Sequence, residues 1–213
     1  IAVVILIFLV KEHGHKITAI KKESLRETLV RCTHLNHYYW RVVCVAFVFM
    51  ISNYSGAFLI FRVSEGSKDL GIAALAMIAQ NLASMVFAYP TGWLSDRMDR
   101  RFILAFGFLL TILSNTCLAY GTSFIWSLVG AGLWGAQLGT VQSLFMAKIT
   151  DHTTQNLRAT AFGLYYVIIA FAVLFSNKLM GYFYEQSPHM GFNASSCVVA
   201  VALVLLPFIR LKK

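Results

Sequence analysis

A small set of polar side chains interrupts otherwise apolar stretches of this sequence. Some are spaced to share one face of a helix: Gln80 and Ser84 are four residues apart, and Trp134 and Gln137 are three apart. Such groups recognise a small molecule through hydrogen bonds rather than by covalent chemistry. The candidates for contact with a small-molecule substrate are Asn53, Gln80, Asn81, Ser84, Trp134, Gln137, Tyr165 and Tyr166. The alternative is that these groups hydrogen-bond neighbouring helices and only hold them together.

The residue patterns of catalytic and metal sites do not appear at comparable positions. The sequence has no His-Glu-x-x-His motif, and its nine acidic residues lie outside the apolar stretches or at their ends. His13-x-His15 and His34-x-x-His37 have ligand-like spacing, but solvated loop histidines are the simpler interpretation. We therefore expect no enzymatic activity, no catalytic residues, no metal and no cofactor.

The segment Gly130-Ala131-Gly132-Leu133-Trp134-Gly135 matches the dinucleotide-binding pattern of glycines. That pattern needs a preceding strand, and here it lies inside an apolar stretch. With Gly139, the glycines instead predict a small-residue face on which another helix packs closely.

The stretches that hold these side chains are long enough to cross a membrane. Hydrophobic residues make up 58% of the chain and charged residues 13%, against about 25% charged residues in soluble domains. A helix of about 20 apolar residues spans the hydrocarbon core, whereas barrel strands are shorter and alternate in polarity. The sequence therefore predicts an all-α integral membrane bundle of six transmembrane helices, over 41–62, 71–94, 102–120, 124–147, 160–182 and 192–209.

Basic residues alternate between the two sides of the predicted membrane. Fifteen of the eighteen Lys and Arg residues fall on the side that holds 11–40, the 95–101 turn, the 148–159 loop and the C-terminus. This asymmetry predicts that these segments are cytoplasmic in a multi-pass plasma (inner) membrane protein. The net charge of +9 therefore reflects topology, and we expect no nucleic-acid partner.

Two segments precede the six predicted helices. Residues 1–10 are uniformly apolar but too short to span, and we expect them to be the end of a truncated transmembrane helix. Residues 11–40 are polar, with apolar residues near helical spacing between Ile17 and Cys32. We expect a cytoplasmic linker with an amphipathic helix at the membrane interface; a solvated linker with some helix is the alternative. The C-terminal bundle then covers 41–213.

The turn between the second and third predicted helices has the most specific local pattern, Gly92-Trp93-Leu94-Ser95-Asp96-Arg97-Met98-Asp99-Arg100-Arg101. We expect Gly92 to permit close helix approach and Asp96 to pair with the arginines or with a helix N-terminus. Asp99 is a residue type that tolerates a left-handed backbone. This segment resembles the signature loop of the major facilitator superfamily, from which it departs at Asp99, where that family usually has glycine. The segment from Leu157 to Tyr165 resembles the start of the family's penultimate helix.

The resemblance implies a twelve-helix fold of two six-helix halves, of which this chain is the second. It further implies a secondary active transporter of a small solute that works by alternating access, with a slight preference for drug or metabolite efflux. Its partners would be a small-molecule substrate, the lipid bilayer and the missing N-terminal six-helix half. Conformational gating would fall to Gly92, Asp96, Arg97, Arg100, Arg101 and Arg158.

Two other interpretations of the whole chain stay open at this point. A membrane-embedded enzyme or a non-transporting subunit would need a converging catalytic or docking site, which the sequence does not indicate. A truncated half-transporter with no activity of its own is the stronger rival, because half a bundle holds only half a cavity.

Overall fold

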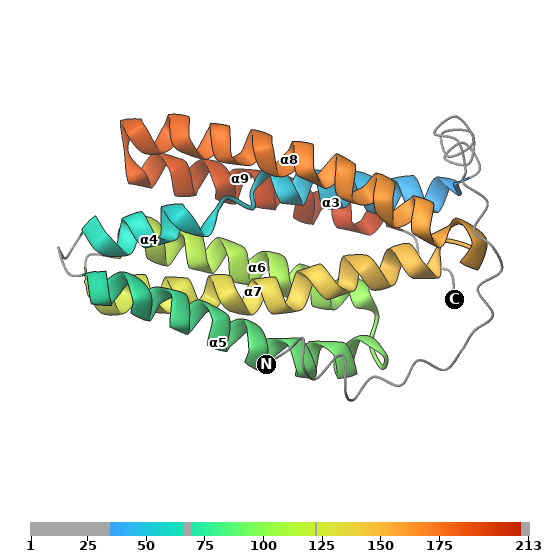
Figure 1. Cartoon of the computed structure of the whole chain (residues 1–213), viewed down its shortest axis with the longest axis horizontal. Helices are drawn as coiled ribbons and strands as arrows, with labels where there is room; N and C mark the ends of the chain where they lie inside the picture. Colours follow the sequence, from blue (N-terminus) through green and yellow to red (C-terminus); the bar gives the residue numbers. More distant parts are fainter. Residues whose placement is uncertain (1–34, 66–69, 122, 210–213) are drawn as a thin grey trace, which may run out of the picture.

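The computed structural model describes residues 35–65, 70–121 and 123–209, and every regular element in this part is helical. The long helices run side by side in one bundle (Figure 1). The elements are α3 (His37–Ile51), α4 (Gly56–Glu65), α5 (Leu70–Ser95), α6 (Arg100–Tyr120), α7 (Phe124–Asp151), η1 (Gln155–Leu157), α8 (Arg158–Gln186), α9 (Pro188–Leu205) and η2 (Leu206–Phe208). The predicted helix end at 1–10 and the amphipathic segment around 17–32 lie outside the described residues.

The helices have the length and composition that crossing a membrane requires. Five segments of the described chain meet both conditions: His37–Glu65, Arg100–Tyr120, Phe124–Asp151, Gln155–Gln186 and Pro188–Phe208. The sixth helix, α5, has 26 residues, which is a rise of about 39 Å and exceeds the hydrocarbon thickness. The prediction of an all-α six-helix membrane bundle is confirmed.

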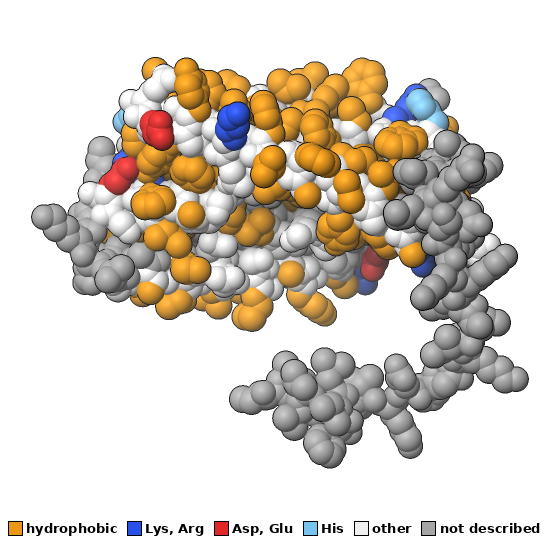
Figure 2. All heavy atoms as spheres, turned by 45° about the horizontal axis from the view of Figure 1, so that its top comes forward, with side chains coloured by type: hydrophobic (Ala, Val, Ile, Leu, Met, Phe, Trp, Pro, Cys, Tyr) orange, Lys and Arg blue, Asp and Glu red, His pale blue; other side chains and the backbone are white. Residues whose placement is uncertain are grey.

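The outer surface of the bundle is apolar along most of its length. Figure 2 shows one face of the molecule, on which hydrophobic side chains extend along the length and most charged side chains lie nearer the two ends. Large apolar residues such as Phe106, Leu113 and Val204 are about half to three-quarters exposed. A soluble protein does not present apolar surface on this scale, so the surface is one that lies in lipid.

The first predicted helix, 41–62, is not continuous, which corrects the sequence-based prediction. The helix stops at Ile51, residues 52–55 are not helical, and a second helix starts at Gly56. Serine side chains compete with the backbone here, because Ser52 Oγ donates to the Phe49 carbonyl and Ser55 Oγ accepts from Ala57 N–H at 3.3 Å. The hydroxyl of Ser55 thus caps the first turn of α4.

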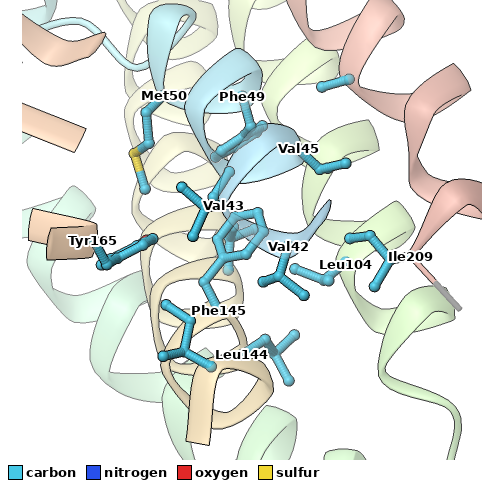
Figure 3. Close-up of a cluster of buried hydrophobic side chains, with 14 of the residues drawn as sticks. Val42, Val43, Val45, Phe49, Met50, Leu104, Leu144, Phe145, Tyr165 and Ile209 are labelled. Atoms are coloured by element: carbon cyan, nitrogen blue, oxygen red, sulfur yellow. The ribbon is translucent and has the colours of Figure 1, made fainter. Parts of the chain in front are cut away.

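The larger of two hydrophobic clusters surrounds α3. Side chains from α3, α6, α7 and α8 meet in it (Figure 3). Phe49 of α3 stacks on Phe108 of α6 with ring centroids 4.3 Å apart. Tyr39 Oη donates a 2.9 Å hydrogen bond to the carbonyl of Ala161 in α8. This cluster packs α3 against its neighbours along the length of the helix, from Tyr39 to Met50.

The end of α6 is held by an arginine from α4. Arg62 Nε donates to the Leu118 carbonyl at 2.6 Å, and Nη2 lies 3.3 Å from the carbonyls of Ala119 and Gly121. A cation at a helix C-terminus satisfies carbonyls that have no partner within the helix. Glu65 pairs with Arg62 at 2.9 Å and accepts from Tyr184 Oη of α8 at 2.8 Å. Arg62 thus joins α4 to α6, and its ion-pair partner Glu65 joins α4 to α8.

The predicted glycine face is present on α7 and packs against α5. A Cβ atom added to Gly135 would lie 1.9 Å from the Gln80 carbonyl oxygen, and one added to Gly139 would lie 2.3 Å from that of Ser84. Both distances are shorter than any van der Waals contact, so only glycine permits this approach. Gly132 is different, because a Cβ atom there would meet nothing within 4 Å.

We predict that Gly135→Ala lowers the free energy of unfolding by about 3 kcal/mol, because the added methyl group displaces the α5 backbone. Gly132→Ala is the matched control in the same helix and leaves stability unchanged or raises it by up to about 1 kcal/mol, as expected for Gly→Ala in an open helix position. Thermal unfolding of the two purified variants in detergent tests this. Equal stabilities would contradict the close α5–α7 contact.

Candidate functional site

A chain of hydrogen bonds holds the non-helical segment 52–55 inside the bundle. Tyr54 Oη donates to Asn115 Oδ1 of α6, and Asn115 Nδ2 donates to Ser195 Oγ of α9, both at 2.9 Å. Ser195 Oγ then donates to the Ser52 carbonyl at 2.9 Å. All four residues are buried. Backbone groups freed by a helix break in lipid need such partners, and this chain supplies them from two neighbouring helices.

A third helix completes the support of the break. Ser55 N–H donates to Asn177 Oδ1 of α8 at 2.7 Å, and Asn177 Nδ2 donates to the Val173 carbonyl at 3.0 Å. Side chains of α6, α8 and α9 therefore all take part in hydrogen bonds that stabilise the break. A discontinuous helix with non-helical backbone is the form that substrate and ion sites take in many membrane carriers.

Several of the predicted substrate contacts converge beside this break. Asn53 lies within it, half-buried, with Nδ2 3.5 Å from Met50 Sδ. Gln80 of α5 is close to the first residue of α4, since a Cβ atom on Gly56 would lie 3.8 Å from Gln80 Oε1. Trp134 of α7 stacks on Tyr54 with ring centroids 5.8 Å apart. Asn53, Gln80 and Trp134 thus each lie within the break or next to a residue at its edge.

Trp134 and Gln137 carry the most unusual polar atoms in the described part of the chain. Both side chains are buried, with exposed fractions of 4% and 2%. Trp134 Nε1 and Gln137 Oε1 have no hydrogen-bond partner there. An unpaired buried donor or acceptor costs about 1–3 kcal/mol. One donor and one acceptor, one turn of α7 apart, are therefore buried without a partner among the described residues, and the donor belongs to the ring that stacks on Tyr54.

The other predicted substrate contacts lie apart from this group. Asn81 is exposed and donates to the Met77 carbonyl of its own helix at 2.8 Å. Ser84 is half-buried where α5 approaches Gly139. Tyr165 is buried in the cluster around α3, whereas its neighbour Tyr166 is 55% exposed. The structure does not bring these four side chains to the break, and their contact with a substrate stays a prediction.

Sequence reasoning missed several members of the polar interior, including Tyr54 and Thr91 as well as Asn115, Asn177 and Ser195 of the network above. Tyr54 connects the break to both Asn115 and Trp134, although its place between Asn53 and Ser55 was a signal that this segment is polar on all sides. Thr91 of α5 is buried, with its hydroxyl 3.4 Å from that of Thr140 in α7. A threonine near Pro90 in an apolar helix gives no comparable signal.

The charged turn between α5 and α6 is organised by Asp99. Its backbone is extended, with φ −61° and ψ 118°, and Oδ1 accepts from Arg101 N–H at 2.9 Å as the N-cap of α6. The left-handed conformation considered for Asp99 is therefore wrong. Oδ2 accepts from Arg101 Nε at 2.9 Å and lies 2.8 Å from Nη2. Partial burial raises the pKa of Asp99, but the hydrogen bonds and charge of Arg101 outweigh this and lower that pKa below its ordinary value.

The arginines of this turn do not pair with Asp96, as was expected, but with other residues. Arg100 forms an ion pair with Asp151 at the end of α7, and Arg97 lies 3.9 Å above the ring of Trp93. Asp96 is exposed and makes no ion pair or hydrogen bond with the described residues, so its predicted pairing with the neighbouring arginines is wrong.

Gly92 and Arg158 do not make the close contacts that were expected of gating residues. A Cβ atom on Gly92 would meet nothing within 4 Å, so the expected close approach does not occur within the described part of the bundle. Arg158 is exposed at the first residue of α8. Lys148 of α7, in contrast, is buried and interacts electrostatically with Asp99 and Asp151. Within this half, the turn is tied to α7 rather than to α8.

We predict that Asp99→Ala lowers the free energy of unfolding by about 1 kcal/mol through loss of the N-cap. Asp99→Asn keeps the cap and loses only the ion pair, so it is less destabilised. Because the pKa of Asp99 is lowered in the folded protein, the advantage of wild type over Asp99→Asn is present above about pH 4 and disappears as the pH falls further. Unfolding measured across this pH range tests it. An advantage that persists in acid would rule out the ion pair as its source.

Comparison with known proteins agrees with this architecture. The family model of the Major Facilitator Superfamily matches residues 1–176 and 42–213. An uncharacterized MFS-type transporter of Methanocaldococcus jannaschii is 28% identical over 173 residues, which is 78% of this chain and 44% of that protein. The quinolone resistance protein NorA of Staphylococcus aureus is 24% identical over 142 residues, 65% of this chain and 37% of that protein.

An uncharacterized transporter of Buchnera aphidicola is 26% identical over 99 residues, 46% of this chain and 24% of that protein. The chain therefore spans less than half the length of the curated relatives it matches. Its helices are long and apolar enough to cross a membrane several times. The chain is a multi-pass membrane protein and belongs to the Major Facilitator Superfamily, a family of transporters.

Proposed function

We propose that this chain forms the second six-helix bundle of a secondary active transporter, which moves a small solute by alternating access between two bundles. Membership of the Major Facilitator Superfamily supports transport, and the shorter length relative to the matched transporters supports a partner bundle that precedes this one. The name of the quinolone resistance relative supports export of a drug-like solute. In this proposal the protein lies in the plasma (inner) membrane, with the linker and C-terminus in the cytoplasm.

The observation that carries this proposal is the pair of unpartnered polar atoms beside the helix break. Trp134 Nε1 and Gln137 Oε1 are buried without partners, while Tyr54, Asn115 and Ser195 close their own network completely. A donor and an acceptor kept free at this depth suit a solute that offers one of each, such as an amide or hydroxyl group.

The surroundings of these atoms favour an aromatic or amphipathic solute. Tyr54 packs against Trp134, Phe58 and Phe192, with ring centroids between 5.7 and 6.4 Å apart. Aromatic walls with a few polar groups are typical of small-molecule sites. The acidic residues in the described part of the chain lie at helix ends or in the turn between α5 and α6: Glu65, Asp96, Asp99, Asp151 and Glu185. A carboxylate for proton coupling, if the protein uses one, would then come from the other bundle.

The charged turn supplies the gate in this proposal. Asp96 is exposed and has no partner among the described residues, whereas Asp99 and Asp151 are paired. A free carboxylate at the cytoplasmic face is then available to a helix of the opposite bundle, where it would close the outward-open state. Arg97, Arg100 and Arg101 hold the turn in place through Trp93, Asp151 and Asp99.

We predict that Trp134→Phe weakens export at least fivefold, because the substitution keeps an aromatic ring but removes the unpaired N–H together with one ring of the indole. The space left by that ring is buried, so the free energy of unfolding falls by about 1–3 kcal/mol. Export of a quinolone from cells or proteoliposomes gives the first value, and thermal unfolding gives the second. Thr116→Val is the control, since Thr116 is exposed on α6 and bonds only within its own helix at 2.8 Å. Equal export by wild type and Trp134→Phe would overturn the substrate role of the indole.

We predict that Asp96→Ala lowers transport about tenfold while leaving the unfolding temperature and membrane insertion unchanged, because Asp96 is exposed and makes no ion pair or hydrogen bond with the described residues. Asp99→Asn is the comparison variant. It removes the same negative charge three residues away, but from a side chain that is paired with Arg101. Flux and unfolding are measured on the same preparations. Unchanged flux in Asp96→Ala would contradict the proposed gating role of this residue.

A further inference from the structure

A groove opens on the outer side of the bundle between α6 and the end of α9. Its volume is about 340 Å³, and it is lined by Arg101, Phe102, Ala105, Leu203, Leu206 and Pro207. This is more than ten times the volume of about 30 Å³ that a water molecule occupies. Its lining is apolar apart from Arg101, so the groove suits an apolar chain with a polar group at one end.

The helices that form the groove present apolar faces along their length. On α6 the exposed residues Phe102, Phe106, Leu109 and Leu113 follow one another at helical spacing. On α9 and η2 the exposed large residues include Val201, Val204 and Phe208. The break and its unpartnered polar atoms belong to other helices. This flank of the bundle therefore faces lipid tails.

Arg101, at the rim of the groove, has hydrogen-bond donors that its ion pair does not use. Arg101 uses Nε and Nη2 on Asp99, which leaves Nη1 without a partner among the described residues. Its side chain is 34% exposed. The groove lies at the end of the bundle where Arg97 and Arg100 are also found, and the sequence continues after Ile209 with Arg210, Lys212 and Lys213. This end of the chain attracts anions rather than cations.

We propose that this groove binds an anionic phospholipid, with an acyl chain against Phe102, Ala105 and Leu203 and the phosphate at the free nitrogen of Arg101. The rim charge selects the headgroup, and the apolar lining retains the chain. A free phosphate ion would use only the arginine and would leave the apolar part of the groove uncovered. Asp99 competes with the headgroup for Arg101, so it limits the affinity of the site.

Phosphatidylglycerol, with phosphatidylcholine of the same chain length as the neutral reference, is the probe. Both are titrated onto the purified protein in detergent, and the bound lipid is counted by native mass spectrometry. Wild type is expected to prefer phosphatidylglycerol. Arg101→Gln should lower that preference about fivefold, which corresponds to the contribution of about 1 kcal/mol from one basic residue near anionic lipid.

Three further variants distinguish the groove from general surface charge. Arg97→Gln is the matched control, because it removes the same charge from a side chain that stacks on Trp93 and does not line the groove. It should change the preference less than twofold. Asp99→Asn keeps the N-cap and frees Arg101, so it should raise the preference. Ala105→Phe fills the groove and should weaken binding of both lipids at unchanged helical content by circular dichroism.

Two results would overturn the proposal. Equal losses in Arg97→Gln and Arg101→Gln would mean that the lipid senses only the total charge of this end. Unaltered binding of both lipids to a folded Ala105→Phe variant, with displacement by millimolar inorganic phosphate, would mean that only a headgroup is recognised and the groove is not used.

Discussion

The need to satisfy backbone groups away from water governs how this bundle is built. Residues 52–55 leave the helix in the middle of a membrane-spanning segment, where no water replaces the lost hydrogen bonds. The partners come from helices distant in sequence: Asn115 and Ser195 through Tyr54 and Ser52, and Asn177 through Ser55. The break is thereby tied to α6, α8 and α9, and the apolar side chains of α3 pack against the same helices.

Helix number and extent could be predicted from sequence because lipid imposes a simple rule. Runs of about 20 apolar residues have few alternatives to a spanning helix, and the predicted bounds of α6 and α7 differ from the observed ones by a few residues. The break could not be predicted in the same way. Asn53 was predicted as a substrate contact, but a continuous helix with its polar face in a cavity fits Ser52, Asn53 and Ser55 equally well. The decision depends on Asn115, Asn177 and Ser195, whose distance to the break is a property of the fold.

The candidate site illustrates the same limit at the level of single residues. Spacing correctly placed Trp134 and Gln137 on one face of α7, and the glycines correctly indicated close packing, since Gly135 and Gly139 contact the α5 backbone. Spacing could not separate Tyr165, which is buried in a hydrophobic cluster, from Tyr166, which is exposed. At the charged turn, the family pattern drew attention to Asp96. The hydrogen bonds instead go to Asp99, because an aspartate directly before a helix is a strong N-cap.

The two kinds of polar group in this bundle differ in a way that bears on function. Around the break, amide and hydroxyl groups are matched with one another, and Arg62 reaches the free carbonyls at the end of α6. Against this background, Trp134 Nε1 and Gln137 Oε1 stay unpaired within the described chain, at a cost of about 1–3 kcal/mol each. A fold that satisfies even an interrupted helix has the means to satisfy these two atoms as well. Leaving them free is explained if their partner arrives from outside the bundle, and this is the role that we propose for the solute.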